Sequence, residues 1–402
     1  MRGPYGALLA TVTLALCEVV LPKGAEATEC SWNDAISGDT HNMLFIDKTA
    51  TYWRAAVAMS EGDHIEVSGA FPHARYMSLV VYDNRARTVD HITDMQVVPD
   101  TGSVNPFLAG ADRTAMERRF TIRVLDQRAP GVGRSPNTLY TESADGSRSV
   151  KGTGKVPLTL RVYAPDAGMD DAGGVPLPDI AIVGSSGKKT RLTPCLGAGT
   201  ASGRGGFIEG VAGRLLTFAL ARRFSGSGTN PPVWKKFLPD GYGENVDASY
   251  VYTTFAPEKF GPVLVVRAKA PSFAATGAGE TPMKSGQLRY WSMCANLVTT
   301  AVLDCVRDEA VPVDAKGDYA IVVSRPEARP KNATSACGFA WIAAAPEDET
   351  ALVYRHVIPD PSFAEAIQKS TKGAEAETMG AYYPRGSYYA TVAEFESLGC
   401  AS

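Results

Sequence analysis

The pentapeptide Arg75–Leu79 reads RYMSL, and Arg289–Met293 reads RYWSM. Similar segments also recur on both sides of these two pentapeptides, in the same order in each half of the chain. A fixed order of matching segments with variable spacing indicates an internal duplication. The sequence therefore predicts one module used twice. The other matching pairs are Thr51–Ala55 with Ser249–Thr253, His64–Pro72 with Pro262–Pro271, Val98–Asp100 with Val311–Asp314, and Leu158–Asp166 with Leu352–Asp360.

Both halves consist of short runs rich in Val, Ile, Tyr and Thr that are broken by Gly, Pro, Asn and Asp. This composition and spacing is typical of strands joined by turns. Met77–Asp83 is a continuous apolar run suited to a central strand, and Arg119–Val124 alternates between polar and apolar residues. We expect a mainly β fold with two duplicated antiparallel β-sandwich or jelly-roll-like modules and a few short helices.

Five segments follow from this pattern along the chain. Residues 181–244 match nothing in the first half and contain one amphipathic helical pattern from Phe207 to Ala219. A second helix start signal lies at Asp360–Pro361, which predicts a short helix over Ser362–Gln368. The predicted segments are a signal peptide (1–27), a first β module (28–180), a linker or insertion (181–244), a second β module (245–361) and a C-terminal tail (362–402).

Composition and charge narrow the range of partners. A net charge of -3 over 402 residues offers no basic face for nucleic acid. Arg2 precedes an apolar run over residues 7–17, and Ala25-Glu26-Ala27 fits a signal-peptidase site. That run is too short to cross a membrane, and no stretch of the roughly 20 residues that a membrane-spanning helix needs is free of charges. We therefore expect a secreted, periplasmic or cell-surface protein without a transmembrane segment in the mature chain.

Six cysteines remain after Ala27, and an even number in an exported chain predicts disulfides. Six cysteines allow 15 connectivities. Cys294 and Cys305 lie on two predicted neighbouring strands and are the first expected pair. The chain contains no C-x-x-C pair and no close pair of histidines, so we expect no metal site and no cofactor.

Four arginines occupy repeated positions. Arg75 and Arg289 begin equivalent predicted strands, and Arg161 and Arg355 lie inside a second equivalent pair. A buried arginine needs a partner, because an unpaired buried charge costs several kcal/mol. One interpretation is a structural ion pair copied with the module. The other is a bidentate grip on a carboxylate, sulfate or phosphate. Candidate ion-pair partners are Asp47, Asp83, Asp166 and Asp247.

The second half also carries a motif that resembles a known family. Asn245-x-Asp247-x-x-Tyr250, followed by Arg289-Tyr290-x-Ser292, resembles the pattern N-x-D-x-x-Y and R-Y-x-S of exported bacterial proteins with domain of unknown function 1254, often partnered with domain 1214. The resemblance implies β-rich modules and export, and no established reaction. The first half has no matching Asn in Asp47–Tyr52, so a site built on Asn245 would be confined to the second module.

These observations lead to three functional hypotheses. The first is a protein that binds an extracellular small ligand, either a glycan or another acidic small molecule. The second is an extracellular hydrolase with Asp247 or His356 as general acid or base and Arg289 stabilising negative charge. The third is a structural envelope protein, which ion pairing of all four arginines would favour. The predicted ligand-binding residues are Asn245, Asp247, Tyr250, Arg289, Tyr290, Arg355 and His356; arginine would hold the anion, and Tyr290, like Tyr76, would stack on a ring.

Overall fold

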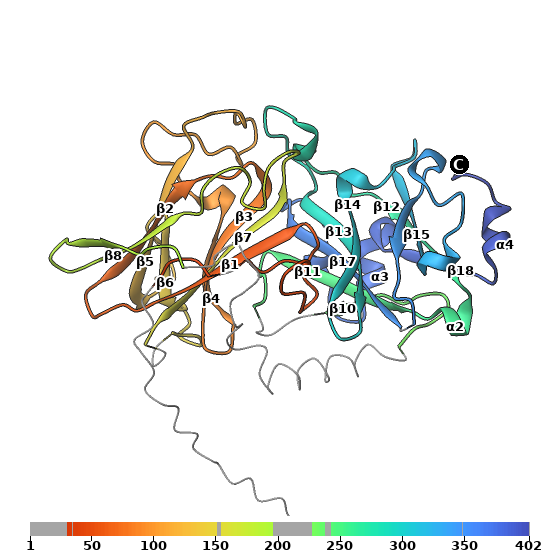
Figure 1. Ribbon diagram of the computed structural model, residues 1–402, viewed down its shortest axis with the longest axis horizontal. Helices are drawn as coiled ribbons and strands as arrows, with labels where there is room; N and C mark the ends of the chain where they lie inside the picture. Colours follow the sequence, from red (N-terminus) through yellow and green to blue (C-terminus); the bar gives the residue numbers. More distant parts are fainter. Residues whose placement is uncertain are drawn as a thin grey trace, which may run out of the picture.

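The computed structural model describes residues 30–33, 35–150, 154–195, 227–237, 243–347 and 349–401. Two β-rich modules lie side by side, one coloured red to yellow-green and the other green to blue (Figure 1). The predicted mainly β fold is confirmed. The predicted signal peptide, residues 1–27, and the predicted amphipathic helix, residues 207–219, lie outside the described residues.

Two sheets form the first module. The strand order of one sheet is β1 (Ala50–Val57), β7 (Val156–Pro165), β3 (Ala74–Tyr82) and β4 (Thr88–Thr93). The order of the other is β6 (Thr138–Glu142), β5 (Arg119–Arg128), β2 (His64–Ala70), β8 (Asp179–Val183) and β9 (Lys189–Arg191). Neighbouring strands are antiparallel except β5 and β6, which pair parallel.

The second module is built the same way. The order of its first sheet is β10 (Lys235–Phe237), β11 (Ala248–Phe255), β17 (Thr350–Pro359), β13 (Leu288–Leu297) and β14 (Val302–Arg307). The order of its second sheet is β16 (Ala340–Ala343), β15 (Asp318–Ser324), β12 (Val263–Lys269) and β18 (Arg385–Tyr389). The run β11-β17-β13-β14 repeats β1-β7-β3-β4, and the parallel pair β15–β16 repeats β5–β6. The predicted duplication therefore holds at the level of topology.

The duplication also preserves strand register. In each module an arginine of the central strand lies between a tyrosine on one neighbouring strand and a serine on the other. Residues directly opposite each other in a sheet point to the same face, so each triplet presents its side chains together. The equivalent triplets are Tyr52, Arg161 and Ser78 in the first module, and Tyr250, Arg355 and Ser292 in the second.

Strand β3 is buried along its whole length, which explains its continuous apolar sequence. Met77, Leu79 and Val81 pack in the core of the first module. Tyr76 points the other way, into a smaller cluster that includes Tyr290 of the second module. A strand covered on both faces has no need for a polar side. The two pentapeptides are therefore the strands at which the modules meet.

The structure moves two of the predicted boundaries. β8 crosses residue 180 and, with β9, completes a sheet of the first module, whereas β10 joins the second. The predicted linker, 181–244, therefore contributes strands to both modules. In the tail, β18 pairs with β12, so residues 362–402 include part of the second module. β8 and β18 each pair with a strand more than 100 residues earlier, so no local turn pattern shows which module they join.

Helices are short throughout the described residues. None of them has the length and apolar composition that crossing a membrane requires. The helix predicted over Ser362–Gln368 is wrong, because that segment forms turns followed by a 3-10 turn at Ile367–Lys369. The α-helices are α2 (Pro257–Phe260), α3 (Glu375–Met379) and α4 (Val392–Glu396), and the other 3-10 turns include η1 (Asp94–Gln96), η2 (Thr276–Ala278) and η3 (Asp308–Ala310).

The described residues contain three disulfides. The predicted pair Cys294–Cys305 is confirmed and joins directly opposite residues of β13 and β14. Cys30–Cys195 links the two ends of the first module, and Cys337–Cys400 fastens the C-terminal segment to the second. Disulfides that close long loops restrict the unfolded chain most, so Cys30–Cys195, with a separation of 165 residues, has the largest effect of this kind.

Candidate functional site at the module interface

Each module places an arginine against a carboxylate of the other module, across the interface between them. Arg75 of the first module reaches Asp308 of the second, with 3.0 Å between Nη1 and Oδ2, and both side chains are fully buried. Arg289 of the second module reaches Asp94 of the first at 3.5 Å, with side chains 8% and 0% exposed. The two arginines also donate to each other's backbone carbonyl oxygens, at 3.3 and 3.4 Å. This reciprocal exchange is a structural ion-pair system.

Burial dominates the titration of the two acceptors. It raises the pKa of Asp94 to about 6, although Arg289 and the backbone N–H of Met77 act in the opposite direction. Burial raises the pKa of Asp308 to about 6 as well, against the effect of Arg75 and the backbone N–H of Trp291. Both carboxyl groups ordinarily titrate at 3.8. The interface therefore takes up protons at mildly acidic pH.

We expect the free energy of unfolding to fall as the pH rises from about 4 to about 7. Because the folded pKa of Asp94 and Asp308 is raised, the folded protein binds more protons than the unfolded chain between the two pKa values. This stability is fully present below the unfolded pKa and is lost as the pH passes about 6. Urea denaturation across this range measures the slope. The neutral variant Asp94→Asn should have a shallower slope, and an equal slope in both proteins would contradict the assignment.

A second reciprocal exchange involves the tyrosines of the two pentapeptides. The Tyr290 hydroxyl donates to Asp47 Oδ2 at 3.0 Å, and the Tyr76 hydroxyl donates to Asp247 Oδ2 at 2.7 Å. Both rings are fully buried, and burial raises the pKa of both hydroxyls well above 10.0, so they remain protonated donors. Each module thus binds the loop that precedes the first repeated strand of the other. The buried rings are not open to stack on a sugar.

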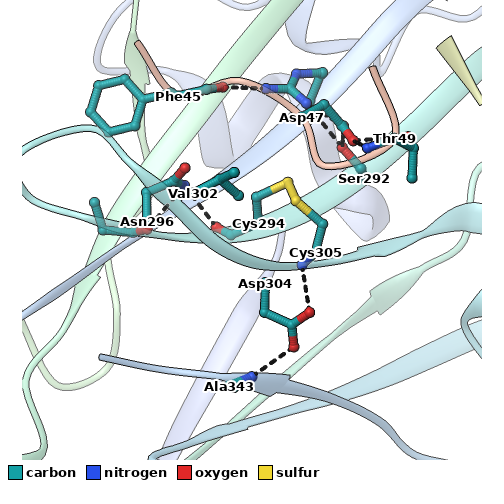
Figure 2. Close-up of a disulfide and its surroundings, with 12 residues drawn as sticks. Phe45, Asp47, Thr49, Ser292, Cys294, Asn296, Val302, Asp304, Cys305 and Ala343 are labelled. Atoms are coloured by element: carbon teal, nitrogen blue, oxygen red, sulfur yellow. Dashed lines mark hydrogen bonds and ion pairs between the residues drawn. A yellow bond between two sulfur atoms is a disulfide. The ribbon is translucent and has the colours of Figure 1, made fainter. Parts of the chain in front are cut away.

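One of these two loops completes an ion pair, which we call the Arg355 site (Arg355, Ser292 and Asp47). Asp47 Oδ2 accepts hydrogen bonds from Arg355 Nη1 and from Ser292 Oγ, the latter at 2.6 Å. Arg355 Nη2 donates to the carbonyl oxygen of Phe45 at 2.8 Å. Figure 2 shows Asp47, Thr49 and Ser292 beside the Cys294–Cys305 disulfide. Burial alone would raise the pKa of Asp47, but Arg355 and the hydrogen bonds lower it, so the carboxylate is charged.

The equivalent position in the other half, the Arg161 site (Arg161, Ser78 and Asn245), lacks the carboxylate. Arg161 Nη2 donates to Gly243 O at 2.8 Å, as Arg355 Nη2 does to Phe45 O. Arg161 Nη1, Ser78 Oγ and Asn245 Nδ2 are all buried and have no hydrogen-bond partner among the described residues. Arg161 is 2% exposed, and no carboxylate of the described chain forms an ion pair with it.

Loop geometry shows that Asn245 stands where Asp47 stands in the other half. Asn245 Oδ1 accepts from the N–H of Asp247 at 3.1 Å, and Asp47 Oδ1 accepts from the N–H of Thr49 at 2.9 Å. Each loop closes with a 3.0 Å bond to the following strand. Because this N–H fixes which amide atom is the oxygen, Asn245 Nδ2 corresponds to Asp47 Oδ2. A donor therefore replaces the acceptor that Arg355 uses.

Three buried donor groups without an acceptor are a costly arrangement. Each unsatisfied group costs about 1–3 kcal/mol. Burial by itself would lower the pKa of Arg161, but the surrounding hydroxyls of Tyr82, Tyr76, Tyr163 and Tyr52 raise it, so the guanidinium stays charged. Its charge lies near the ring faces of Tyr52 and Tyr82, at 5.4 and 5.6 Å. The chemistry of this position suits an anionic oxygen.

Asp247 lies next to the Arg161 site but is already engaged. Besides Tyr76, it faces His91 Nε2, at 3.4 Å from Asp247 Oδ1. The side chains of His91 and Asp247 are 33% and 10% exposed, so this pair is partly open to solvent. In the other half, Thr49 occupies the position of Asp247. In the second half the loop therefore carries its carboxylate two residues later, at Asp247, where it bonds to Tyr76 and not to Arg161.

The predicted site residues fall into separate places. Asn245 belongs to the Arg161 site, and Asp247 lies beside it. Tyr290 and Arg355 donate to Asp47 at the Arg355 site, and the Tyr250 ring lies 5.2 Å from the Arg355 guanidinium. Arg289 is paired with Asp94. Prediction missed Ser78 and did not commit to Arg161, although RY-x-S and the repeated arginine were both visible.

His356 is a core residue of the second module. Its ring is fully buried, packs edge-on against Tyr354, and accepts a hydrogen bond at Nδ1 from the Ile367 N–H at 3.2 Å. Burial lowers its pKa to about 3, so the imidazole is neutral at ordinary pH. The predicted role of His356 as a ligand or general acid or base has no solvent-exposed atom to support it.

One group of potential metal ligands lies within the described residues: Asp47, Cys294 and Cys305. The two cysteines form a disulfide and therefore offer no thiolate. Asp47 is already the acceptor for Arg355 and Ser292. The donor set as it stands does not suit a metal ion.

Comparison with known proteins gives a similarity in fold alone. No protein-family model matches the chain, and no curated protein matches its sequence. An uncharacterised protein from Burkholderia cenocepacia is similar over 91% of this chain and 83% of that chain, with a TM-score of 0.51 and 13% identity. A protein from Vibrio parahaemolyticus is similar over 87% and 92%, with a TM-score of 0.41 and 12% identity. The first similarity supports the β architecture and assigns no reaction.

Proposed function

We propose that the protein is exported and binds a small acidic molecule at the Arg161 site. The observation that carries this proposal is the set of three buried groups, Arg161 Nη1, Ser78 Oγ and Asn245 Nδ2, that have no acceptor among the described residues. An anionic oxygen at this position would accept from all three. The three disulfides fit an oxidising compartment, which is consistent with the predicted export.

The protein itself contains a template for such a complex. In the Arg355 site, Asp47 Oδ2 occupies the place that the ligand oxygen would take, and it accepts from Arg355, Ser292 and Tyr290. Bonds between a guanidinium and a carboxylate are charge-assisted and stronger than neutral ones. The Arg161 site therefore favours an acidic small molecule over a neutral glycan. Ion pairing of three of the four repeated arginines supports a structural role for those three only.

Asn245→Asp should close the site from within. The new carboxylate would pair with Arg161 as Asp47 pairs with Arg355, so we expect a gain of about 1–3 kcal/mol in the free energy of unfolding. Ligand binding to the native state raises stability by about 2.7 kcal/mol at 100 times Kd. Thermal melts with acetate, phosphate and sulfate should therefore show stabilisation in the wild type and none in Asn245→Asp.

The matched control is Gln127→Glu, which adds the same charge at an exposed position of β5. This variant should respond to the acids as the wild type does. If no acid stabilises the wild type, or if Asn245→Asp responds as strongly as Gln127→Glu, the Arg161 site binds no anion and its donors are satisfied by water.

A further inference from the structure

A second arginine lies on the same face as Arg161. In the pairing of β1 with β7, Tyr52 is opposite Arg161 and Arg54 is opposite Thr159. Residues two apart on a strand point to the same side, so Arg54 and Arg161 are diagonal neighbours on adjacent strands. Diagonal neighbours lie about 7–8 Å apart, within reach of two long side chains. The two guanidinium groups can therefore face one ligand.

Arg54 is only partly buried, and its guanidinium has no hydrogen bond or ion pair with another residue in the part of the chain that the structure describes. Burial lowers its pKa, and the nearby hydroxyl of Tyr82 acts in the opposite direction. Tyr82 also accepts a hydrogen bond from Arg161 Nη2. Tyr82 therefore interacts with both arginines.

Comparison of the two halves shows that this positive charge is specific to the first module. The strand register places Tyr252 in β11 where Arg54 stands in β1. Tyr252 is buried against Phe45 and Phe237. Two of the differences between the halves make the surroundings of the repeated arginine more positive: Asn245 in place of Asp47 removes one negative charge, and Arg54 in place of Tyr252 adds one positive charge. The carboxylate that the loop gained, Asp247, is bonded to Tyr76 and faces His91.

We infer that the ligand of the Arg161 site carries two acidic groups, one bound at Arg161 and the other at Arg54. This inference rests on the proposed function and adds the chemical class of the ligand, a short dianion such as a dicarboxylate. The acidic group at Arg161 takes the place that Asp47 Oδ2 occupies in the Arg355 site. The outer group meets Arg54, which is the more exposed of the two arginines.

The test compares straight-chain acids of equal length with one or two carboxylates. Isothermal titration with butyrate, valerate and hexanoate against succinate, glutarate and adipate measures the advantage of the second carboxylate. We expect at least one diacid to bind the wild type about 10-fold more tightly than the matching monoacid. In Arg54→Gln the affinity for that diacid should fall to the level of the monoacid. Arg119→Gln, which removes an exposed arginine from β5, should keep the 10-fold advantage.

The possible results separate this inference from the proposal on which it rests. Equal binding of monoacids and diacids by the wild type would overturn the dianion inference and leave the Arg161 site as a site for one anionic group. A diacid advantage that survives Arg54→Gln would also overturn it, because another group would then hold the second carboxylate. Binding of neither series would overturn both.

Discussion

Asp47→Asn should be among the most destabilising single substitutions in this protein. The variant would leave Arg355 without its buried carboxylate and would put a second amide where Asp47 Oδ2 now accepts from Arg355, Ser292 and Tyr290. Removing one partner of a buried ion pair costs about 3–5 kcal/mol. Urea denaturation at neutral pH measures this loss as a lower midpoint with an unchanged slope.

The same variant should acquire a new dependence on small acids, because its Arg355 site would then resemble the Arg161 site. Formate or acetate should restore part of the lost stability in Asp47→Asn, and more than it adds to the wild type. Sodium chloride at equal ionic strength is the control for general salt effects. A loss below about 1 kcal/mol, or equal responses to formate and chloride, would show that the carboxylate of Asp47 does not have the role assigned to it.

Arg75→Met should also cost about 3–5 kcal/mol, because it leaves Asp308 buried without its cation. Arg289→Met should cost less, because the Arg289–Asp94 pair is longer, at 3.5 Å, and Arg289 is not fully buried. Denaturant unfolding of both variants gives the order. Burial raises the pKa of Asp308 to about 6, so at pH 5 its carboxyl group is mostly protonated and needs no cation. The cost of Arg75→Met should therefore be smaller at pH 5 than at pH 8.

A double-mutant cycle separates the ion pair from other effects of the substitution. Asp308→Asn in the Arg75→Met background should cost less than Asp308→Asn alone, because the charge it removes has already lost its partner. Additive costs would mean that Arg75 and Asp308 stabilise the interface independently of each other. Arg289→Met costing more than Arg75→Met would contradict the ranking by burial and distance.

The sequence was sufficient for the architecture because the duplication preserved both strand order and register. Arg161 and Arg355 could be matched from their flanking residues, and both lie at equivalent positions of equivalent strands. Strands such as β18 could not be predicted in the same way, because β18 pairs with β12 more than 100 residues earlier, as its topological counterpart β8 pairs with β2. Pairing over that distance leaves no local pattern.

The site was harder to predict for a physical reason. Its groups come from both modules. A repeat shows which residues are equivalent, but it does not show that residues of one module contact residues of the other. Asp47 was a candidate ion-pair partner, and it does pair with Arg355. Asp94 and Asp308 lie at equivalent positions after β4 and β14, but they were missing from the candidate partners because each pairs with an arginine of the other module. The decisive difference, Asn245 in place of Asp47, could have been read from the loop Asp47–Tyr52, where the absence of a matching Asn indicated asymmetry.

A crystal structure of the protein grown with 3-bromopropionate would locate an anion at the Arg161 site, because the bromine identifies the molecule by anomalous scattering. We expect a carboxylate oxygen between Arg161 Nη1, Asn245 Nδ2 and Ser78 Oγ, in the position equivalent to Asp47 Oδ2, with no such molecule at Arg355. Ordered water alone on these three groups, with the bromine elsewhere or absent, would contradict the assignment of an anion site to the module interface.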